Sequence, residues 1–396
     1  MPEPSTNEEG NSSSISVPIF DLQFEKEIVD EFSQKAVDVL TSGRPLSENR
    51  YCREFEAAFQ DLTNAKHAIA VNSGTMALEI CLRAVGVAGK VVITPSNTFF
   101  ATQVAATSAQ ASIAFVDIEP EYLQICPSHL KQLLERYPTG QVGAVVIVHI
   151  GGIISPHMNE IRHACQSHSV SLIEDAAHAH LSHLNGEYAG SFGDAAAFSF
   201  FPTKVMTAGE AGMITTSSSK LHKAMLSIKE FGRQIEGAKT SRIVQVRTDG
   251  VNGRISEMTG LLGLLECRRV SRRIEKRNLL VSTYALKLDP NYFRVVQQEE
   301  GACAYYKCIV ILENGARGKR EDLREYAAEK GVMFTGEVYF RGVHEMPAYA
   351  GQLQERLPVT EDLCANHVCP PLYPELTLDA VNHVCAIMNG YFTRAA

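Results

Sequence analysis

Lys204 is the residue of this sequence whose surroundings best suit covalent chemistry. It follows the apolar run Ala196–Phe200, in a loop that also contains Pro202 and Gly209. A lysine that lies out of water or near another positive charge loses its proton more easily, and its free amine can attack an aldehyde to form a Schiff base. Most lysines are solvated loop residues, so Lys204 taken singly indicates little.

A second candidate group is the carboxylate of Asp175, which follows the apolar run Ser171–Glu174. A carboxylate at the end of a buried strand is costly unless it is paired. A protonated pyridine nitrogen would pair with Asp175, and the carboxylate would in turn keep that nitrogen protonated. The alternative is a helix N-cap, a position that aspartate also favours.

Gly74 and Thr75 follow the run His67–Val71 and precede a helical pattern, which is where an anion site is expected. Free N–H groups and the helix dipole at such a terminus attract phosphate, and Ser199 could add a hydroxyl. An ordinary helix cap is the alternative. Phe99 follows another run and could stack on a flat ring; alternatively it is a core residue, as we expect for one member of the pair Phe99-Phe100.

Three histidines, His178, His180 and His183, suggest a metal site at first sight. With this spacing the three side chains would not share one face of a helix, and they would not share one face of a strand. No cluster of carboxylates or thiols accompanies them. We therefore predict no metal site.

The elements that would position these residues form a doubly wound α/β arrangement. Apolar runs rich in β-branched residues alternate with helical patterns, which is typical of strands buried on both faces of a mostly parallel sheet. Ligands bind beyond the carboxyl ends of such strands. The further runs are Val91–Thr94, Ile113–Val116 and Ala144–Val148, and the helical stretches are Met76–Val85, Phe100–Ser108 and Met158–His168.

The pattern changes towards the C-terminus. Glu257–Asn278 reads as one long helix, Cys308–Leu312 as a strand, and Lys319–Lys330 and Thr377–Phe392 as helices. The sequence therefore predicts a disordered tail (residues 1–16), a large α/β domain (residues 17–270) and a small α+β domain (residues 271–396).

The composition is that of a globular protein and argues against nucleic acid as a partner. Of 396 residues, 45% are hydrophobic and 21% charged, and 37 basic against 45 acidic residues give a net charge of -8. Nucleic acid requires clustered Lys and Arg. The chain lacks both a run of about 18 apolar residues and a secretory signal. We expect a cytoplasmic protein without membrane partners, whose ten scattered cysteines are mostly buried thiols.

Together these residues resemble the sugar aminotransferases of fold type I, the DegT/DnrJ/EryC1/StrS family. The resemblance extends from about residue 53 to residue 391. It implies a seven-stranded, mostly parallel sheet domain like that of aspartate aminotransferase, with a smaller C-terminal α+β domain. The segments that carry it are Phe55–Phe59, Asn72–Thr75, Thr98–Phe99, Val116–Ile118, Glu174–His178, Ser199–Phe200, Lys204, Gly209–Glu210, Asn252 with Arg254, and His344.

The resemblance implies that pyridoxal 5'-phosphate is the cofactor, with Lys204 as its Schiff-base residue and proton carrier. It also implies a homodimer with shared active sites. The roles that it implies for other residues are phosphate binding by Gly74, Thr75 and Ser199, ring stacking by Phe99, pairing with the ring nitrogen by Asp175, a place near the ring for His178, phosphate binding across the dimer by Asn252, and the substrate side for His344 and Arg254.

The function implied is transfer of an amino group from an amino acid, with glutamate as the expected donor, to a keto-sugar nucleotide or a related keto-cyclitol. Two alternatives stay open: a pyridoxal-phosphate-dependent dehydratase, and a non-catalytic scaffold. The dehydratases of this family replace the lysine, so Lys204 favours transamination. Intact Lys204 and Asp175 together count against a scaffold.

Overall fold

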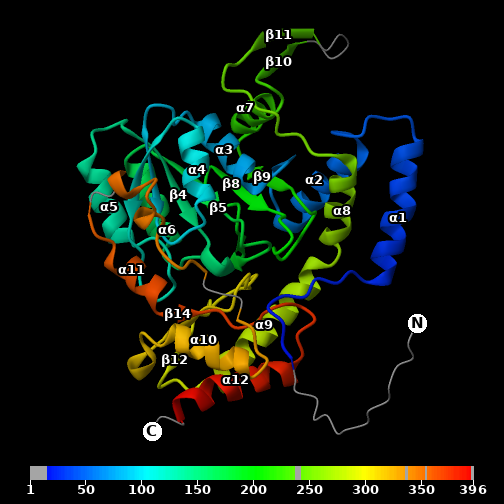
Figure 1. Ribbon diagram of the computed structural model, residues 1–396. Helices are drawn as coiled ribbons and strands as arrows, with labels where there is room; N and C mark the ends of the chain where they lie inside the picture. The colour runs from blue at the N-terminus through cyan, green and yellow to red at the C-terminus, as the bar shows by residue number, and fades with distance from the viewer. Residues whose placement is uncertain (1–15, 237–241, 335–337, 353–354, 394–396) are drawn as a thin grey trace.

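The computed structural model describes residues 16–236, 242–334, 338–352 and 355–393 of the chain (Figure 1). All but the last residue of the expected N-terminal tail therefore lies outside the described residues. A seven-stranded sheet forms the centre of the described chain. Its strands are β1 (His67–Val71), β2 (Val91–Pro95), β3 (Ser112–Val116), β4 (Val142–Val148), β5 (Ser171–Asp175), β8 (Ala195–Ser199) and β9 (Gly212–Thr216).

The strand order is β1-β9-β8-β5-β4-β2-β3, and the sheet is mostly parallel, as expected. β9 pairs antiparallel with both β1 and β8, whereas the other neighbouring pairs run parallel. All six predicted strands are present. The seventh, β9, was missed because Gly212 follows a glycine-containing loop that reads as a turn.

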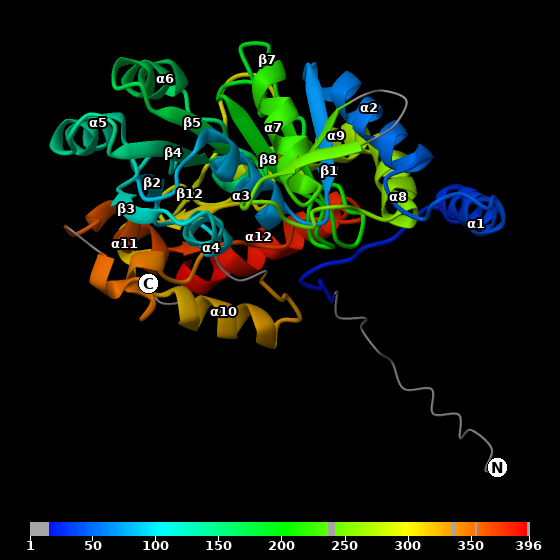
Figure 2. The same ribbon diagram turned by 90° about the horizontal axis from the view of Figure 1, so that it is seen from above.

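Both faces of the sheet are buried, because alternate residues of each strand enter different hydrophobic clusters. In β2, for example, Val91 and Ile93 join one cluster and Val92 joins the other. Helices cover the two faces (Figure 2). On one face lie α3 (Gly74–Val85), α4 (Ala101–Ser108) and α7 (Ser219–Lys229); on the other lie α2 (Arg50–Thr63), α5 (Pro127–Arg136) and α6 (Met158–Ser167).

The long helix expected over Glu257–Asn278 is wrong. The chain forms two helices instead, α8 (Glu257–Cys267) and α9 (Val270–Lys287), with a break at residues 268–269. The break allows each helix a different partner: α8 packs on α2 and α1 (Lys26–Thr41), whereas α9 packs on the C-terminal helix α12 (Leu378–Thr393). No glycine or proline marks residues 268–269, so the local sequence does not signal this change of direction.

The C-terminal part of the chain gathers on one side of the large sheet (Figure 1), around an apolar cluster that also includes Val148 of β4 and Ile150 after it. The predicted strand and helices at Cys308–Leu312, Lys319–Lys330 and Thr377–Phe392 are present with small changes of bounds. The exact domain boundary stays a prediction. The remaining elements here are β12 (Phe293–Val295), β13 (Val310–Leu312), β14 (His367–Val368), α10 (Arg320–Glu329) and α11 (Pro358–Ala365).

Two antiparallel hairpins complete the strands, and one of them, β10–β11, projects away from the body of the molecule (Figure 1). All cysteines except the half-buried Cys126 are buried, which confirms the expected burial. Among the described residues, no helix combines the length and the apolar composition that crossing a bilayer requires. The hairpin strands are β6 (His183–Leu184), β7 (Glu187–Tyr188), β10 (Arg233–Glu236) and β11 (Arg242–Val246), and the short 3₁₀ turns are η1 (Ile150–Gly152), η2 (Asn314–Ala316), η3 (Val343–Glu345) and η4 (Ala350–Gln352).

Candidate active site

A cavity of about 430 Å³ lies at the carboxyl ends of β4, β5 and β8. It brings together most of the residues singled out in the sequence, although they come from distant parts of the chain. Those that line it are Gly74, Thr75, Phe99, Asp175, His178, Ser199 and Lys204.

One wall of the cavity is the N-terminus of α3. The Ser73 hydroxyl caps this helix by accepting a hydrogen bond from the Met76 N–H at 3.1 Å. A Cβ placed on Gly74 would lie 2.6 Å from the Cβ of Ser199, so only glycine allows this close approach. The first N–H groups of a helix have no partner within it. The helix terminus and the Ser199 hydroxyl therefore form one polar cradle that suits a phosphate.

Asp175 ends β5 with its carboxylate half-buried in the cavity wall. Its Oδ2 accepts a hydrogen bond from the Thr102 hydroxyl at 2.8 Å, and its Oδ1 accepts one from the Ala177 N–H at 3.2 Å. Burial raises the pKa of Asp175, while these hydrogen bonds and the nearby charge of Lys204 act in the opposite direction. A cationic group in the cavity would relieve the cost of burying this carboxylate.

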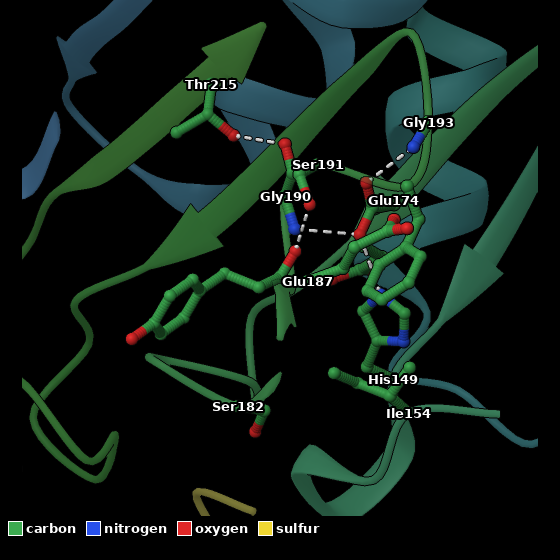
Figure 3. Close-up of polar contacts among 12 residues, drawn as sticks. His149, Ile154, Glu174, Ser182, Glu187, Gly190, Ser191, Gly193 and Thr215 are labelled. Atoms are coloured by element: carbon green, nitrogen blue, oxygen red, sulfur yellow. Dashed lines mark hydrogen bonds and ion pairs between the residues drawn. The ribbon is translucent and has the colours of Figure 1, made fainter. Parts of the chain in front are cut away.

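The residue before Asp175 is also held by hydrogen bonds (Figure 3). The preceding residue, Glu174, is completely buried, and its carboxylate accepts hydrogen bonds from the N–H groups of Gly190 and Gly193, both at 2.7 Å. The His149 ring lies 2.9 Å from the same carboxylate. These bonds fix the end of β5 to two loops.

Lys204 reaches the cavity from the loop after β8. Burial is the main cause that lowers its pKa to about 8, and the charge of Lys307 adds to this effect, while the charge of Asp175 opposes it. Its Nζ lies 4.4 Å from the ring centre of Tyr306. Near neutral pH more of Lys204 is therefore the free amine than in an ordinary lysine, and this is the form that attacks an aldehyde.

Tyr306 is a cavity residue that sequence reasoning missed. Its ring stacks on His178 with centroids 4.1 Å apart, and its hydroxyl lies 3.0 Å from the Thr203 hydroxyl. The His178 Nδ1 accepts a hydrogen bond from the Gly151 N–H at 3.3 Å, and burial holds the pKa of this histidine well below its ordinary value. A neutral His178 with its proton on Nε2 is the result.

Tyr306, Lys307 and Tyr339 all line the cavity from the C-terminal part of the chain. They lie more than a hundred residues after Lys204, and their spacing matches no local pattern that would connect them with it. Only the packing of the C-terminal part against the sheet places them here.

The expectation that Phe99 or Phe100 is a core residue is wrong. The exposed fractions of the two side chains are 51% and 44%, and their rings lie 4.1 Å apart. Phe201, from the loop that carries Lys204, is also exposed at 44%. Phe99 lines the cavity as expected, but in the single chain it has solvent on one side.

Three of the singled-out residues do not line the cavity of the single chain. Asn252 is exposed, and its carbonyl accepts a hydrogen bond from the Asn72 amide at 3.0 Å. Arg254 lies 3.6 Å from Glu230. His344 is buried with its Nδ1 2.6 Å from the Ser96 hydroxyl, so its contacts do not place it at a substrate surface.

The three closely spaced histidines do not converge on a common point. The His178 ring stacks on Tyr306, the His180 ring packs against Phe200, and the His183 ring packs against Tyr188. Each ring has a different aromatic partner because the chain between them is made of turns and begins β6 at His183. No group of three or more metal-binding side chains was found among the described residues.

Comparisons with known proteins agree with this geometry. The model of the DegT/DnrJ/EryC1/StrS aminotransferase family matches residues 26–389. GDP-perosamine synthase of Escherichia coli O157:H7 is 29% identical over 348 residues, which cover 88% of this chain and 92% of that protein. UDP-4-amino-4,6-dideoxy-N-acetyl-beta-L-altrosamine transaminase of Campylobacter jejuni is 27% identical, covering 86% of this chain and 88% of that protein.

A solved structure extends the similarity to the whole fold. DesI, whose structure was determined in the presence of its TDP-sugar product, is 26% identical with a TM-score of 0.81. The alignment covers 94% of this chain and 93% of DesI. From the family model, the relatives and the shared fold together, the chain belongs to the DegT/DnrJ/EryC1/StrS aminotransferase family, whose enzymes use pyridoxal phosphate.

Proposed function

We propose that this chain transfers the amino group of glutamate to the keto group of a nucleotide-linked sugar, with Lys204 as the group that moves the proton. The observation that carries the proposal is the placement of Lys204 and Asp175 in one cavity with the polar cradle at the N-terminus of α3. The relatives support a sugar nucleotide as acceptor, because their names specify GDP-, UDP- and TDP-linked sugars.

The residues of the cavity fit pyridoxal phosphate in size, charge and polarity. The cradle of Gly74, Thr75 and Ser199 suits the phosphate group, and the half-buried carboxylate of Asp175 suits the ring nitrogen. When bound, the cofactor supplies an electrophilic carbon and a ring that accepts electrons. Its ring nitrogen would relieve the burial of Asp175.

Lys204 is suited to two tasks. As a free amine it can hold the cofactor covalently, and once an amino substrate has displaced it, the same amine can take up the proton next to the substrate nitrogen. A pKa lowered to about 8 lets the amine accept and release this proton near neutral pH. The Tyr306 ring beside it provides a face that attracts the ammonium form.

We further propose that the enzyme acts as a cytoplasmic homodimer. The exposed side chains of Phe99 and Phe201 line the cavity, and the exposed ring of Phe100 lies 4.1 Å from that of Phe99. Covering these rings would remove apolar area from water. Asn252 is exposed and lies outside the cavity of its own chain, so it is available to a neighbouring subunit. Arg254 would support the loop, and a role for His344 would act through Ser96.

The proposal is tested by mass spectrometry of keto-sugar nucleotides incubated with glutamate and the enzyme. We expect an aminated sugar and 2-oxoglutarate in equal amounts from the wild type, and negligible product from Lys204→Ala. The surface variant Lys220→Ala is the matched control and should keep full activity. Ammonia release without consumption of glutamate would identify a dehydratase instead, and near-normal turnover by Lys204→Ala would refute the assigned mechanism.

A further inference from the structure

The loop that follows Lys204 is held by two side chains from the junction of α8 and α9. Arg273 Nη1 donates a hydrogen bond to the carbonyl oxygen of Val205 at 3.2 Å. Glu266 Oε2 accepts one from the N–H of Thr207 at 3.3 Å. The same two side chains contact each other, with Arg273 Nη1 2.5 Å from Glu266 Oε2. The backbone one and three residues after Lys204 is therefore tied to a single ion pair.

This ion pair is buried. The exposed fraction of Glu266 is 0% and that of Arg273 is 7%, and a second cation, Arg269, donates to the other oxygen of Glu266 at 2.7 Å. Transferring two charges from water into the protein interior costs free energy that their mutual attraction often does not repay. A hydrophobic pair of similar volume is often as stabilising, so a buried ion pair is weak evidence for a stabilising role. Its bonds to the lysine loop point to another role.

We propose that Glu266 and Arg273 are positioning residues for Lys204: they fix the loop after it so that its amine stays in the cavity beside Tyr306. This inference rests on the proposed role of Lys204 in the reaction. Neither side chain lines the cavity, so both act through the backbone of residues 205–207.

A purely structural role is the alternative, and α8 provides a matched control for it. Glu257, at the other end of the same helix, is equally buried at 2% exposure. Its carboxylate accepts hydrogen bonds from the N–H groups of Asn49, Tyr51 and Cys52, at the start of α2. Glu257→Gln therefore removes a buried carboxylate from the same helix without touching the lysine loop.

The experiment compares Glu266→Gln, Glu257→Gln and the wild type as full-length chains freed of cofactor. The rate at which acetic anhydride labels Lys204 is measured across pH by mass spectrometry, with the melting temperature measured in parallel. The midpoint of this pH dependence is the pKa of the Lys204 amine and is called its labelling pKa. If the loop relaxes, the amine becomes more accessible to water, and we expect its labelling pKa to rise by about half a unit or more in Glu266→Gln. Glu257→Gln should lower the melting temperature while the labelling pKa stays within about 0.2 units of wild type.

The direction of this shift separates positioning from simple electrostatics. Loss of the negative charge of Glu266 would by itself lower the pKa of a nearby lysine, so only movement of the loop produces a rise. An unchanged or lower labelling pKa in Glu266→Gln would overturn the proposal, as would an equal rise in Glu257→Gln. Asp175 and Lys307, the charged groups that act on Lys204, are the same in all these chains.

A second variant decides the case if Glu266→Gln does not fold. Arg273→Lys keeps the charge that balances Glu266, but a single ammonium on a shorter side chain cannot bridge Glu266 and the Val205 carbonyl as the guanidinium does. We expect the same rise of the labelling pKa in this variant, and a wild-type labelling profile would refute the proposal. Labelling needs neither cofactor nor substrate, so its outcome is independent of whether the proposed transamination is correct.

Discussion

At the scale of single residues, burial acts in opposite directions on the two ionisable groups of the site. It lowers the pKa of Lys204 to about 8 and raises the pKa of Asp175, so each group moves towards its neutral form. The mutual attraction of the two charges opposes both shifts but does not cancel them. Such a site suits a ligand with two properties. It has a positive charge that favours the ionised form of Asp175, and it reacts with the neutral amine of Lys204.

The pKa of Lys204 predicts how capture of the cofactor depends on pH. Only the neutral amine reacts, so the rate at which the cofactor-free chain takes up pyridoxal phosphate should rise about tenfold per pH unit at low pH. It should level off above the pKa of about 8. Stopped-flow absorbance of the forming complex measures this rate. A profile that keeps rising to about pH 10, the value of an ordinary lysine, would contradict the lowered pKa.

Asp175→Asn tests the charge at the ring nitrogen. An ion pair that shifts a pKa by two units is worth about 2.7 kcal/mol, so we expect turnover to fall about a hundredfold or more with little change in melting temperature. Steady-state kinetics and thermal unfolding measure the two effects.

The matched control for Asp175→Asn is Asp117→Asn, at the end of β3. The Asp117 carboxylate accepts hydrogen bonds from the N–H groups of Val359 and Thr360 at the start of α11, and therefore acts as a helix cap. This variant should lose stability, by about 1 kcal/mol, and keep its turnover. If Asp175→Asn behaves in the same way, Asp175 is a helix cap and nothing more.

At the scale of elements, the site depends on how closely α3 approaches the end of β8. The distance is set by Gly74, where an added Cβ would meet the Cβ of Ser199 at 2.6 Å and its Cα at 3.1 Å. Backbone atoms cannot move aside as the end of a flexible side chain can. The helix terminus and the Ser199 hydroxyl therefore form one cradle only while residue 74 is glycine.

Gly74→Ala should push the N-terminus of α3 away from Ser199 and weaken phosphate binding. We expect the dissociation constant for pyridoxal phosphate to rise about tenfold or more, because one lost charge-assisted hydrogen bond costs about 1.5 kcal/mol or more. Fluorescence titration of the cofactor-free chain measures it. Gly315→Ala is the control, since its Cβ would have only an ordinary contact at 3.9 Å. Equal affinities in the two variants would show that the cradle is not the phosphate site.

At the scale of the whole molecule, the single chain leaves the rings of Phe99, Phe100 and Phe201 exposed, and two of them, Phe99 and Phe201, line the cavity. Asn252 is also exposed and lies outside the cavity of its own chain. Both observations are expected if a second copy covers the cavity mouth and contributes the loop with Asn252. In a two-fold dimer such a contribution is reciprocal, so each chain would complete two half-sites.

Complementation between inactive chains tests this shared site. A Lys204→Ala chain mixed with an Asn252→Ala chain would form heterodimers in which one site contains both intact residues. We expect activity above that of either variant alone, up to about a quarter of the wild type for random mixing of the subunits. If mixed dimers form and the activity does not rise, or if the wild type is active as a monomer, the shared site is refuted.

The sequence predicted the positions of the strands, and of several residues that line the cavity, because both depend on local patterns. A buried strand requires an uninterrupted apolar run, and the residue after such a strand in a parallel sheet lies at the ligand-binding edge. Asp175, Ser199 and Lys204 could be assigned to one site for this reason. The helix expected over residues 257–278 failed because no local residue marks the point where α8 and α9 turn towards different partners.

What the sequence by itself determined is therefore the sheet and the polar groups at its carboxyl edge, since a strand's apolar run and the residue after it are neighbours in the chain. Only the tertiary structure decided which distant segments close the cavity and hold its lysine. Tyr306 reaches Lys204, and Glu266 and Arg273 reach the loop after it, through packing between elements far apart in sequence. These contacts depend on how helices turn and dock, which is a property of the whole folded chain.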